Sequence, residues 1–139
     1  MDYRLHDVTQ FPFVSLRADS CYPGYASQWG AEMEALLDSN QPFVVAYEPG
    51  PSQETLEDYK ARGLWLKQNK ARFAGRCAAM IAIMPDSIDR ENFKQNAEKR
   101  TKGMGVKYCS AESFEAAAAL AAALIKAALK FNPHPKGLN

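Results

Sequence analysis

Two continuous apolar segments, 43–47 and 77–84, dominate the hydrophobic pattern of the chain. Each is short, rich in branched or small apolar residues and bounded by residues that break a strand, which is typical of buried strands in a parallel sheet. Between them, segment 52–73 carries apolar residues at helical spacing. The pattern therefore predicts a β-α-β unit, around which the other segments can be placed.

The N-terminal part predicts two short strands followed by a helix. Residues 3–8 and 11–18 have β-like patterns and are close enough in the chain to form an antiparallel hairpin. Pro12 lacks a backbone N–H, so we expect the second strand to start at a sheet edge or at a bulge. Segment 25–40 predicts an amphipathic helix, because one face carries four large apolar residues: Trp29, Met33, Leu36 and Leu37.

The C-terminal part continues the alternation. Segment 89–102 predicts a polar helix, 106–109 a short strand, and 111–130 an alanine-rich helix that can pack closely on a sheet. The element order is β-β-α-β-α-β-α-β-α. It predicts one α/β domain over residues 1–131, with a mixed, mostly parallel sheet, an antiparallel N-terminal edge and right-handed crossovers. Residues 132–139 predict a flexible tail.

The central helix also carries a prediction about packing. We expect one stripe of this helix to face the sheet or a neighbouring helix, with Gly63 at a close approach: Leu56, Tyr59, Gly63, Leu66 and Phe73. Leu66 and Ile81 should both be buried between this helix and the sheet. Ser52 is the expected N-cap of the helix, because its hydroxyl can accept a backbone hydrogen bond.

Composition and charge narrow the functional classes. The chain has 139 residues, 47% of them hydrophobic, and a formal net charge of +1, so it has no global field that would attract nucleic acid or an anionic membrane. The three cysteines, Cys21, Cys77 and Cys109, are odd in number, and the residues after Met1 lack the apolar core of a signal peptide. We therefore expect a cytoplasmic protein with no membrane span.

The residues carry few signs of catalysis. His6 and His134 lie at opposite ends of the chain, and neither has the spacing of a metal site. The chain lacks the glycine-rich phosphate and dinucleotide loops, the GxSxG nucleophile motif and the CxxC motif. Cys77 and Cys109 border predicted strands and are expected to be small buried thiols. The sequence thus predicts no catalytic residues, no metal and no cofactor.

The element order, the length and two packing motifs resemble a known family. The run W-L-K-x-N-x-x-R-F at 65–73, followed by AAMIAIMP at 78–85, is similar to the SpoIIAA-like, or STAS-like, bacterial domains. The resemblance covers nearly the whole chain and implies the fold of anti-sigma-factor antagonists. In phosphorylatable antagonists of that fold, a D-S-S-G-like loop carries a serine that a partner kinase modifies. Ser52 has the matching place, but the aspartate, the second serine and the glycine are absent, so we interpret it as an N-cap.

Two candidate binding sites follow from the predicted topology. The helix starts gather where the parallel strands end, and in open α/β sheets this edge forms the usual binding crevice. The loop after strand 43–47 contains two prolines, which make it rigid and so lower the entropy cost of binding a partner. The predicted partner- or ligand-binding residues are Tyr47, Glu48, Pro49, Gly50, Pro51, Ser52, Asp86 and Ser87. Helix ends gather cations at the opposite edge, where the alternative basic site would be Lys67, Lys70, Arg72 and Arg76.

The predicted function is non-enzymatic binding of a protein partner in a regulatory or neutralising role, which includes an immunity-type inhibitor of a toxin. A sensor that binds a small molecule or lipid at the strand ends is one alternative, and a small hydrolase or transferase is another. An exposed aromatic patch would favour the first class, a deep apolar pocket the second, and a perturbed acid–base pair the third. Association of two copies as a homodimer stays open.

Overall fold

The computed structural model describes residues 1–131, so the predicted tail at 132–139 lies outside the described part. Within residues 1–131, the elements follow one another in this order: β1 (His6–Gln10), β2 (Phe13–Leu16), a 3-10 turn (Ala18–Ser20), α1 (Ala26–Asp38), β3 (Phe43–Tyr47), α2 (Leu56–Gln68), α3 (Lys70–Arg76), β4 (Cys77–Ile83), α4 (Ser87–Met104), β5 (Lys107–Ala111) and α5 (Phe114–Phe131). The predicted order is confirmed, except that the central helix is divided into α2 and α3.

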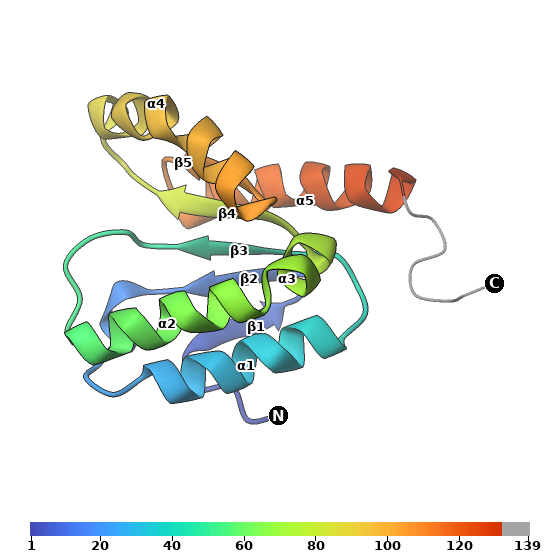
Figure 1. The fold of residues 1–139 in the computed structure, drawn as a ribbon. Helices are drawn as coiled ribbons and strands as arrows, with labels where there is room; N and C mark the ends of the chain where they lie inside the picture. Colours follow the sequence, from blue (N-terminus) through green and yellow to red (C-terminus); the bar gives the residue numbers. More distant parts are fainter. Residues whose placement is uncertain (132–139) are drawn as a thin grey trace.

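The five strands of the described residues form one mixed sheet in the order β1-β2-β3-β4-β5 (Figure 1). β1 pairs with β2 in antiparallel orientation, and each of the other neighbours pairs in parallel. The predicted α/β fold with an antiparallel N-terminal edge is thus confirmed. No helix of the described residues is long and apolar enough to cross a membrane.

Alternating residues of the central strands supply the two cores. Phe43 and Val45 of β3 pack with α1 and with Phe73 of α3 on one face of the sheet. Val44 and Ala46 pack with α5 on the other face. Helices cover both faces of a parallel sheet, so residues on both sides of its strands are buried and the strands are apolar along their whole length. Ile81 is fully buried, but against α5 on the other face of the sheet and not beneath the central helix as predicted, because alternate residues of β4 face opposite sides; Leu66 is only partly buried.

The hairpin between β1 and β2 contains Pro12 in its turn, after a cis Phe11–Pro12 peptide bond. β2 lies between β1 and β3, so Pro12 does not mark the edge of the sheet. The register between β1 and β2 shifts beside the turn, between Asp7 and Gln10, which is the predicted alternative of a bulge. Pro12 itself stays outside the ladder and accepts a hydrogen bond from Val44 through its carbonyl.

A buried carboxylate on α1 holds the N-terminal segment in place. Glu32 is 0% exposed and accepts hydrogen bonds from the backbone N–H groups of Arg4, Leu5 and His6, from the His6 ring at 2.8 Å and from Gln28. Burial alone would raise the pKa of Glu32, but these hydrogen bonds outweigh it and lower the pKa to about 2. His6 is thus buried and bonded through Nδ1, whereas its Nε2 is buried with no hydrogen-bond partner among the described residues.

The orientation of α2 contradicts the prediction. Leu56 and Tyr59 are 64% and 62% exposed, and no atom outside the helix comes within 4 Å of the position of a Cβ on Gly63. The helix instead directs Asp58 and Arg62 toward α1 and its preceding loop, and Trp65 stacks edge-on against Trp29 with ring centroids 5.2 Å apart. The prediction is wrong for the start of the stripe, where Trp65 and a set of polar bonds make the contacts, but its last members do pack: Leu66 is partly buried and Phe73, in α3, is fully buried.

Both ends of α2 are fixed by local hydrogen bonds. Thr55, not Ser52, is the N-cap: its hydroxyl accepts from the N–H of Asp58, and the Asp58 carboxylate accepts from the N–H of Thr55. At the other end the Asn69 side chain donates to the carbonyl of Trp65 at 2.9 Å. The backbone N–H of Asn69 donates to the same carbonyl, and the division between α2 and α3 falls at Asn69 because its φ of −113° and ψ of 17° depart from helical values.

Candidate functional site

The carboxyl edge of the sheet, where β2, β3, β4 and β5 end, is the candidate site. These strands are mutually parallel, so the loops that follow them open on the same edge, and α1, α2, α4 and α5 start there. The predicted site residues 47–52 follow β3 and residues 86–87 follow β4. The topology therefore brings both predicted groups to one edge. It adds a third segment that the sequence interpretation did not include, the loop 17–25 between β2 and α1.

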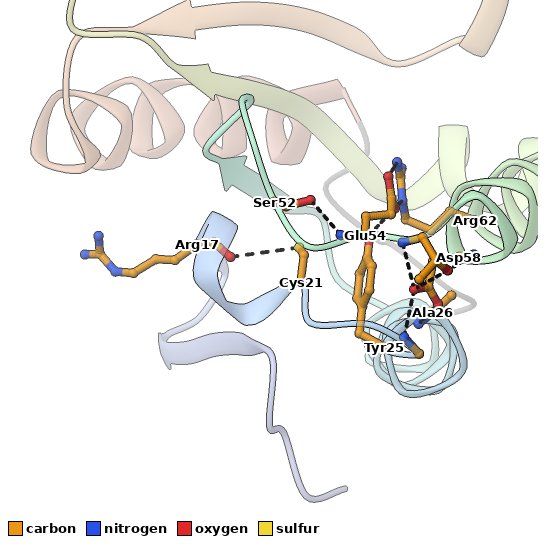
Figure 2. Close-up of polar contacts among 10 residues, drawn as sticks. Arg17, Cys21, Tyr25, Ala26, Ser52, Glu54, Asp58 and Arg62 are labelled. Atoms are coloured by element: carbon orange, nitrogen blue, oxygen red, sulfur yellow. Dashed lines mark hydrogen bonds and ion pairs between the residues drawn. The ribbon is translucent and has the colours of Figure 1, made fainter.

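Hydrogen bonds join this third loop to the loop after β3. The Glu48 carboxylate accepts from the backbone N–H of Ala18 at 2.9 Å, and the hydroxyl of Tyr25 donates to Glu54. Figure 2 shows the second part of this arrangement, with the side chains of Tyr25, Glu54 and Arg62 meeting between the two loops and α2. The two loops consequently form one continuous surface.

An ion pair between Arg62 of α2 and Glu54 of the loop after β3, here called the clamp, stabilises this surface. Arg62 donates to both oxygens of Glu54, at 2.6 and 3.1 Å, in the bidentate geometry that makes arginine–carboxylate pairs strong. The Arg62 guanidinium lowers the pKa of Glu54, and the Glu54 carboxylate raises that of Arg62. Burial raises the pKa of Tyr25. A carboxylate with a lowered pKa and a phenol with a raised pKa are both poorly placed for proton transfer near neutral pH, so the clamp is best described as structural.

Asp58 ties the start of α1 to the start of α2. Its carboxylate accepts from the backbone N–H groups of Gly24 at 2.8 Å and Ala26 at 3.2 Å, in addition to its bonds with Thr55. The bond from Gly24 is the main cause of the lowered pKa of Asp58. Asp58 is nearly fully buried, so this carboxylate is an anchor and not a ligand for a partner.

The predicted site residues divide into anchors and exposed groups. Glu48 is an anchor, Ser52 accepts from the N–H of Glu54 at 3.2 Å, and Asp86 is the N-cap of α4. Pro49, Gly50, Pro51 and Ser87 are exposed. Gly50 has φ 139°, which residues with a side chain rarely adopt. Tyr47 is half-buried, and burial raises its pKa while the nearby Arg100 acts in the opposite direction.

Exposed apolar side chains add to this edge. Tyr22 lies in the loop before α1, Leu56 and Tyr59 lie in the first turns of α2, and Ile88 starts α4. All four are at least 45% exposed. Sequence reasoning missed Leu56 and Tyr59 because it assigned them to the buried stripe. The i, i+4, i+7 spacing of Asp58, Arg62 and Trp65 was the signal for the face that actually packs.

The rival basic edge is partly neutralised. Arg72 forms ion pairs with Glu34 at 3.0 Å and Asp38 at 3.7 Å, and Arg76 donates to the side chain of Asn40. A cavity of about 380 Å³ lies between these side chains and the end of α1. The remaining two predicted cations, Lys67 and Lys70, are exposed. Cations also lie near the carboxyl edge, where Arg17, Arg62 and Arg90 are found, so positive charge is not confined to the basic edge.

Other chemistry has little support among residues 1–131. No three His, Cys, Asp or Glu side chains of this part of the chain come together as metal ligands. The cysteines are free, and burial raises the pKa of Cys77 to about 12 and also raises that of Cys21 and Cys109, which disfavours reactive thiolates.

Comparison of the chain with protein-family models, with curated proteins and with solved structures found no match. The class that the structure defines is an α/β protein with a five-stranded mixed sheet in the part of the chain it describes. The resemblance to STAS-like domains stays a prediction from the sequence.

Proposed function

We propose that the protein is a STAS-like, non-enzymatic regulator that binds a protein partner at its carboxyl edge. The observation that carries the proposal is the outward apolar face of α2, where Leu56 and Tyr59 are 64% and 62% exposed. We name this surface, together with Tyr22, the apolar rim. A single exposed leucine is ordinary, but neighbouring large apolar groups beside a rigid loop are typical of an interface.

The chemistry of the apolar rim suits protein recognition. Two of its three members are tyrosines, which combine a large apolar body with a polar tip and are enriched at the energetic centres of interfaces. Arg62 lies 5.8 Å from the centroid of the Tyr59 ring, close enough to limit the motion of that ring.

Rigidity also supports a binding role. The Glu54–Arg62 clamp, the Asp58 bonds and the two prolines of the loop after β3 hold the edge in one conformation before a partner arrives. A preorganised surface loses less conformational entropy on binding, so more of the contact energy appears as affinity.

The other two functional classes have weaker support. A sensor would need a pocket at the strand ends; the groove of about 500 Å³ between α4 and β5 is lined by Ser87 of the predicted site, but not by any residue of the loop 47–52. A hydrolase or transferase would need an acid–base pair that titrates near neutral pH, and the Tyr25–Glu54 pair has its pKa values displaced away from that range.

Affinity capture from a lysate of the native host, with mass spectrometry, tests the proposal. Three baits are compared: the wild-type chain, Leu56→Asp with Tyr59→Asp, and Leu129→Asp as a matched control. Leu129 is also an exposed apolar residue, 41% exposed, but it lies near the end of α5, away from the carboxyl edge. We expect a partner that the wild type and the control retain and that the double variant loses.

A fourth bait addresses the basic edge. Lys67→Glu with Lys70→Glu reverses two exposed charges that make no ion pair within the described residues. If this variant loses the partner while the Leu56→Asp, Tyr59→Asp variant keeps it, the basic edge is the interface and the proposal is wrong.

A further inference from the structure

A groove of about 500 Å³ lies between α4 and the edge strand β5. Its walls are formed by Phe93, Lys94 and Ala97 of α4 and by the backbone and side chains of β5 at 108–110. Phe93 is half-buried and Ala97 is buried. The groove therefore has an apolar wall on one side and a strand edge on the other.

The outer edge of β5 lies beside α4 and carries backbone groups that do not pair with β4. Within residues 1–131, β5 pairs with β4 alone. The carbonyl of Ala111 accepts from the N–H of Met84 after β4, so residue 111 is directed toward β4. Backbone groups alternate along a strand, so Tyr108 and Ser110 direct theirs outward. The N–H of Tyr108 confirms this direction, because it donates to the Thr101 hydroxyl of α4 at 2.9 Å. The outward groups beyond that bond are the carbonyl of Tyr108 and the N–H and carbonyl of Ser110.

The charges beside the groove favour an acidic occupant. Arg90 and Lys94 are one turn apart on α4 and outnumber the single acid of the wall, Glu91. Arg90 is fixed by bonds to the carbonyls of Met84 and Pro85, both at 2.8 Å. Lys94 is exposed and makes no ion pair in the described part of the chain. A carboxylate at this place would meet two cations.

We propose that this groove binds an extended, acidic segment of a partner protein, which adds to β5 as a further strand and directs a carboxylate toward Lys94. Strand addition draws its affinity from main-chain hydrogen bonds and its selectivity from the side chains that alternate along the added strand. Here one side of the added strand would contact Phe93 and Ala97. The proposal does not depend on the apolar rim, which is formed by other residues.

The opposite edge of the sheet differs. The backbone N–H groups of residues 4–6, which lead into β1, are already bonded to Glu32, and a register shift interrupts the ladder of β1. Pairing of β5 with β5 of a second copy would bring two basic walls together, which like charges oppose. These differences favour β5 as the docking edge and another protein as its occupant.

Display of short random peptides against the intact chain tests the proposal. We expect the enriched peptides to alternate apolar residues with Asp or Glu. The tightest of them should bind Lys94→Glu about tenfold more weakly, because a charge-assisted contact is lost. Lys102→Glu is the control, since Lys102 is an exposed lysine of the same helix outside the groove, and its pair with Glu98 at 4.0 Å is itself exposed and contributes little. Methylation of the peptide's own backbone nitrogens, one at a time, should abolish binding at alternate positions, and the Ser110 amide resonance should shift on binding.

Several results would overturn the proposal. These are the absence of any enriched peptide, an equal loss in Lys94→Glu and Lys102→Glu, and binding that survives every backbone methylation. A concentration-dependent dimer in sedimentation, lost in Lys94→Glu, would instead assign the edge to a second copy. Loss of peptide binding in Leu56→Asp with Tyr59→Asp, but not in Lys94→Glu, would move the peptide site to the apolar rim.

Discussion

Helices α1 and α2 have the same length, 13 residues, and lie side by side on one side of the sheet, yet they are stabilised differently (Figure 1). α1 buries Trp29, Met33, Leu36 and Leu37 against the sheet and its neighbours. α2 packs mainly on α1 and buries only Asp58 among its residues. α1 is thus part of the core, whereas α2 is an outer layer held by the partly buried Trp65 and Leu66 and by a set of polar bonds.

The difference explains why apolar residues stay exposed on α2. The bonds of Asp58 and Arg62 fix the rotation of the helix about its axis, so Leu56 and Tyr59 are left on the outside. Rotating the helix to bury them would break these bonds and leave charged groups without partners, which costs more than the apolar contact would return. The hydrogen bonds of Asp58 and Arg62 therefore keep Leu56 and Tyr59 exposed to solvent.

The largest difference should appear when the leucines of the two helices are truncated. Leu36→Ala removes a side chain that is 1% exposed and should lower the free energy of unfolding by about 2–5 kcal/mol. Leu56→Ala should change it by less than about 0.5 kcal/mol, because the side chain is already in water. Urea unfolding of the two variants measures both values, and equal losses would mean that α2 packs as tightly as α1.

The buried carboxylate of α1 predicts a dependence on pH. The pKa of Glu32 is about 2 in the folded chain, against an ordinary value of 4.5 for a glutamate. Between these two values the unfolded state binds a proton at Glu32 and the folded state does not. The stabilisation is present above pH 4.5 and should be lost as the pH falls toward 2, by about 3 kcal/mol in total.

Unfolding by urea between pH 5 and pH 2 checks this prediction in the wild type and in Glu32→Gln. The variant should be less stable at pH 5 but should have a flatter profile, because its amide does not titrate. Other carboxylates contribute to both profiles alike. Parallel slopes in the two proteins would show that Glu32 is not the group responsible.

A smaller effect separates the two candidate caps of α2. Thr55→Ala removes the hydroxyl that bonds Asp58 and should cost about 1 kcal/mol. Ser52→Ala removes only an exposed contact with Glu54 and should change stability by less than about 0.5 kcal/mol. The reverse order in thermal or urea unfolding would restore Ser52 as the N-cap.

The fold could be predicted because its signals are local. Strands such as 43–47 are continuous apolar segments, the stripe of Trp29 and Leu36 has one clear period, and the element order restricts the topology. The same topology placed residues 47–52 and 86–87 at one edge without any knowledge of side-chain contacts.

The details of the site depend on contacts between distant residues, which no periodicity reveals. Glu54 and Asp58 bond to residues more than 28 positions earlier in the chain, Tyr25 and Gly24. The spacing of apolar residues along α2 therefore predicted the wrong buried face, because polar bonds to distant residues determine how the helix is rotated about its axis. The T-x-x-D spacing of Thr55 and Asp58 is the one local signal that would have corrected the cap.

The central claim is that the apolar rim is free in the isolated protein and is used by a partner. Urea unfolding of Leu56→Asp with Tyr59→Asp tests its structural half most directly. We predict a free energy of unfolding within about 1 kcal/mol of the wild type, because charged residues on an exposed helix face are tolerated. A loss of several kcal/mol would show that these side chains are buried and that α2 presents no docking face.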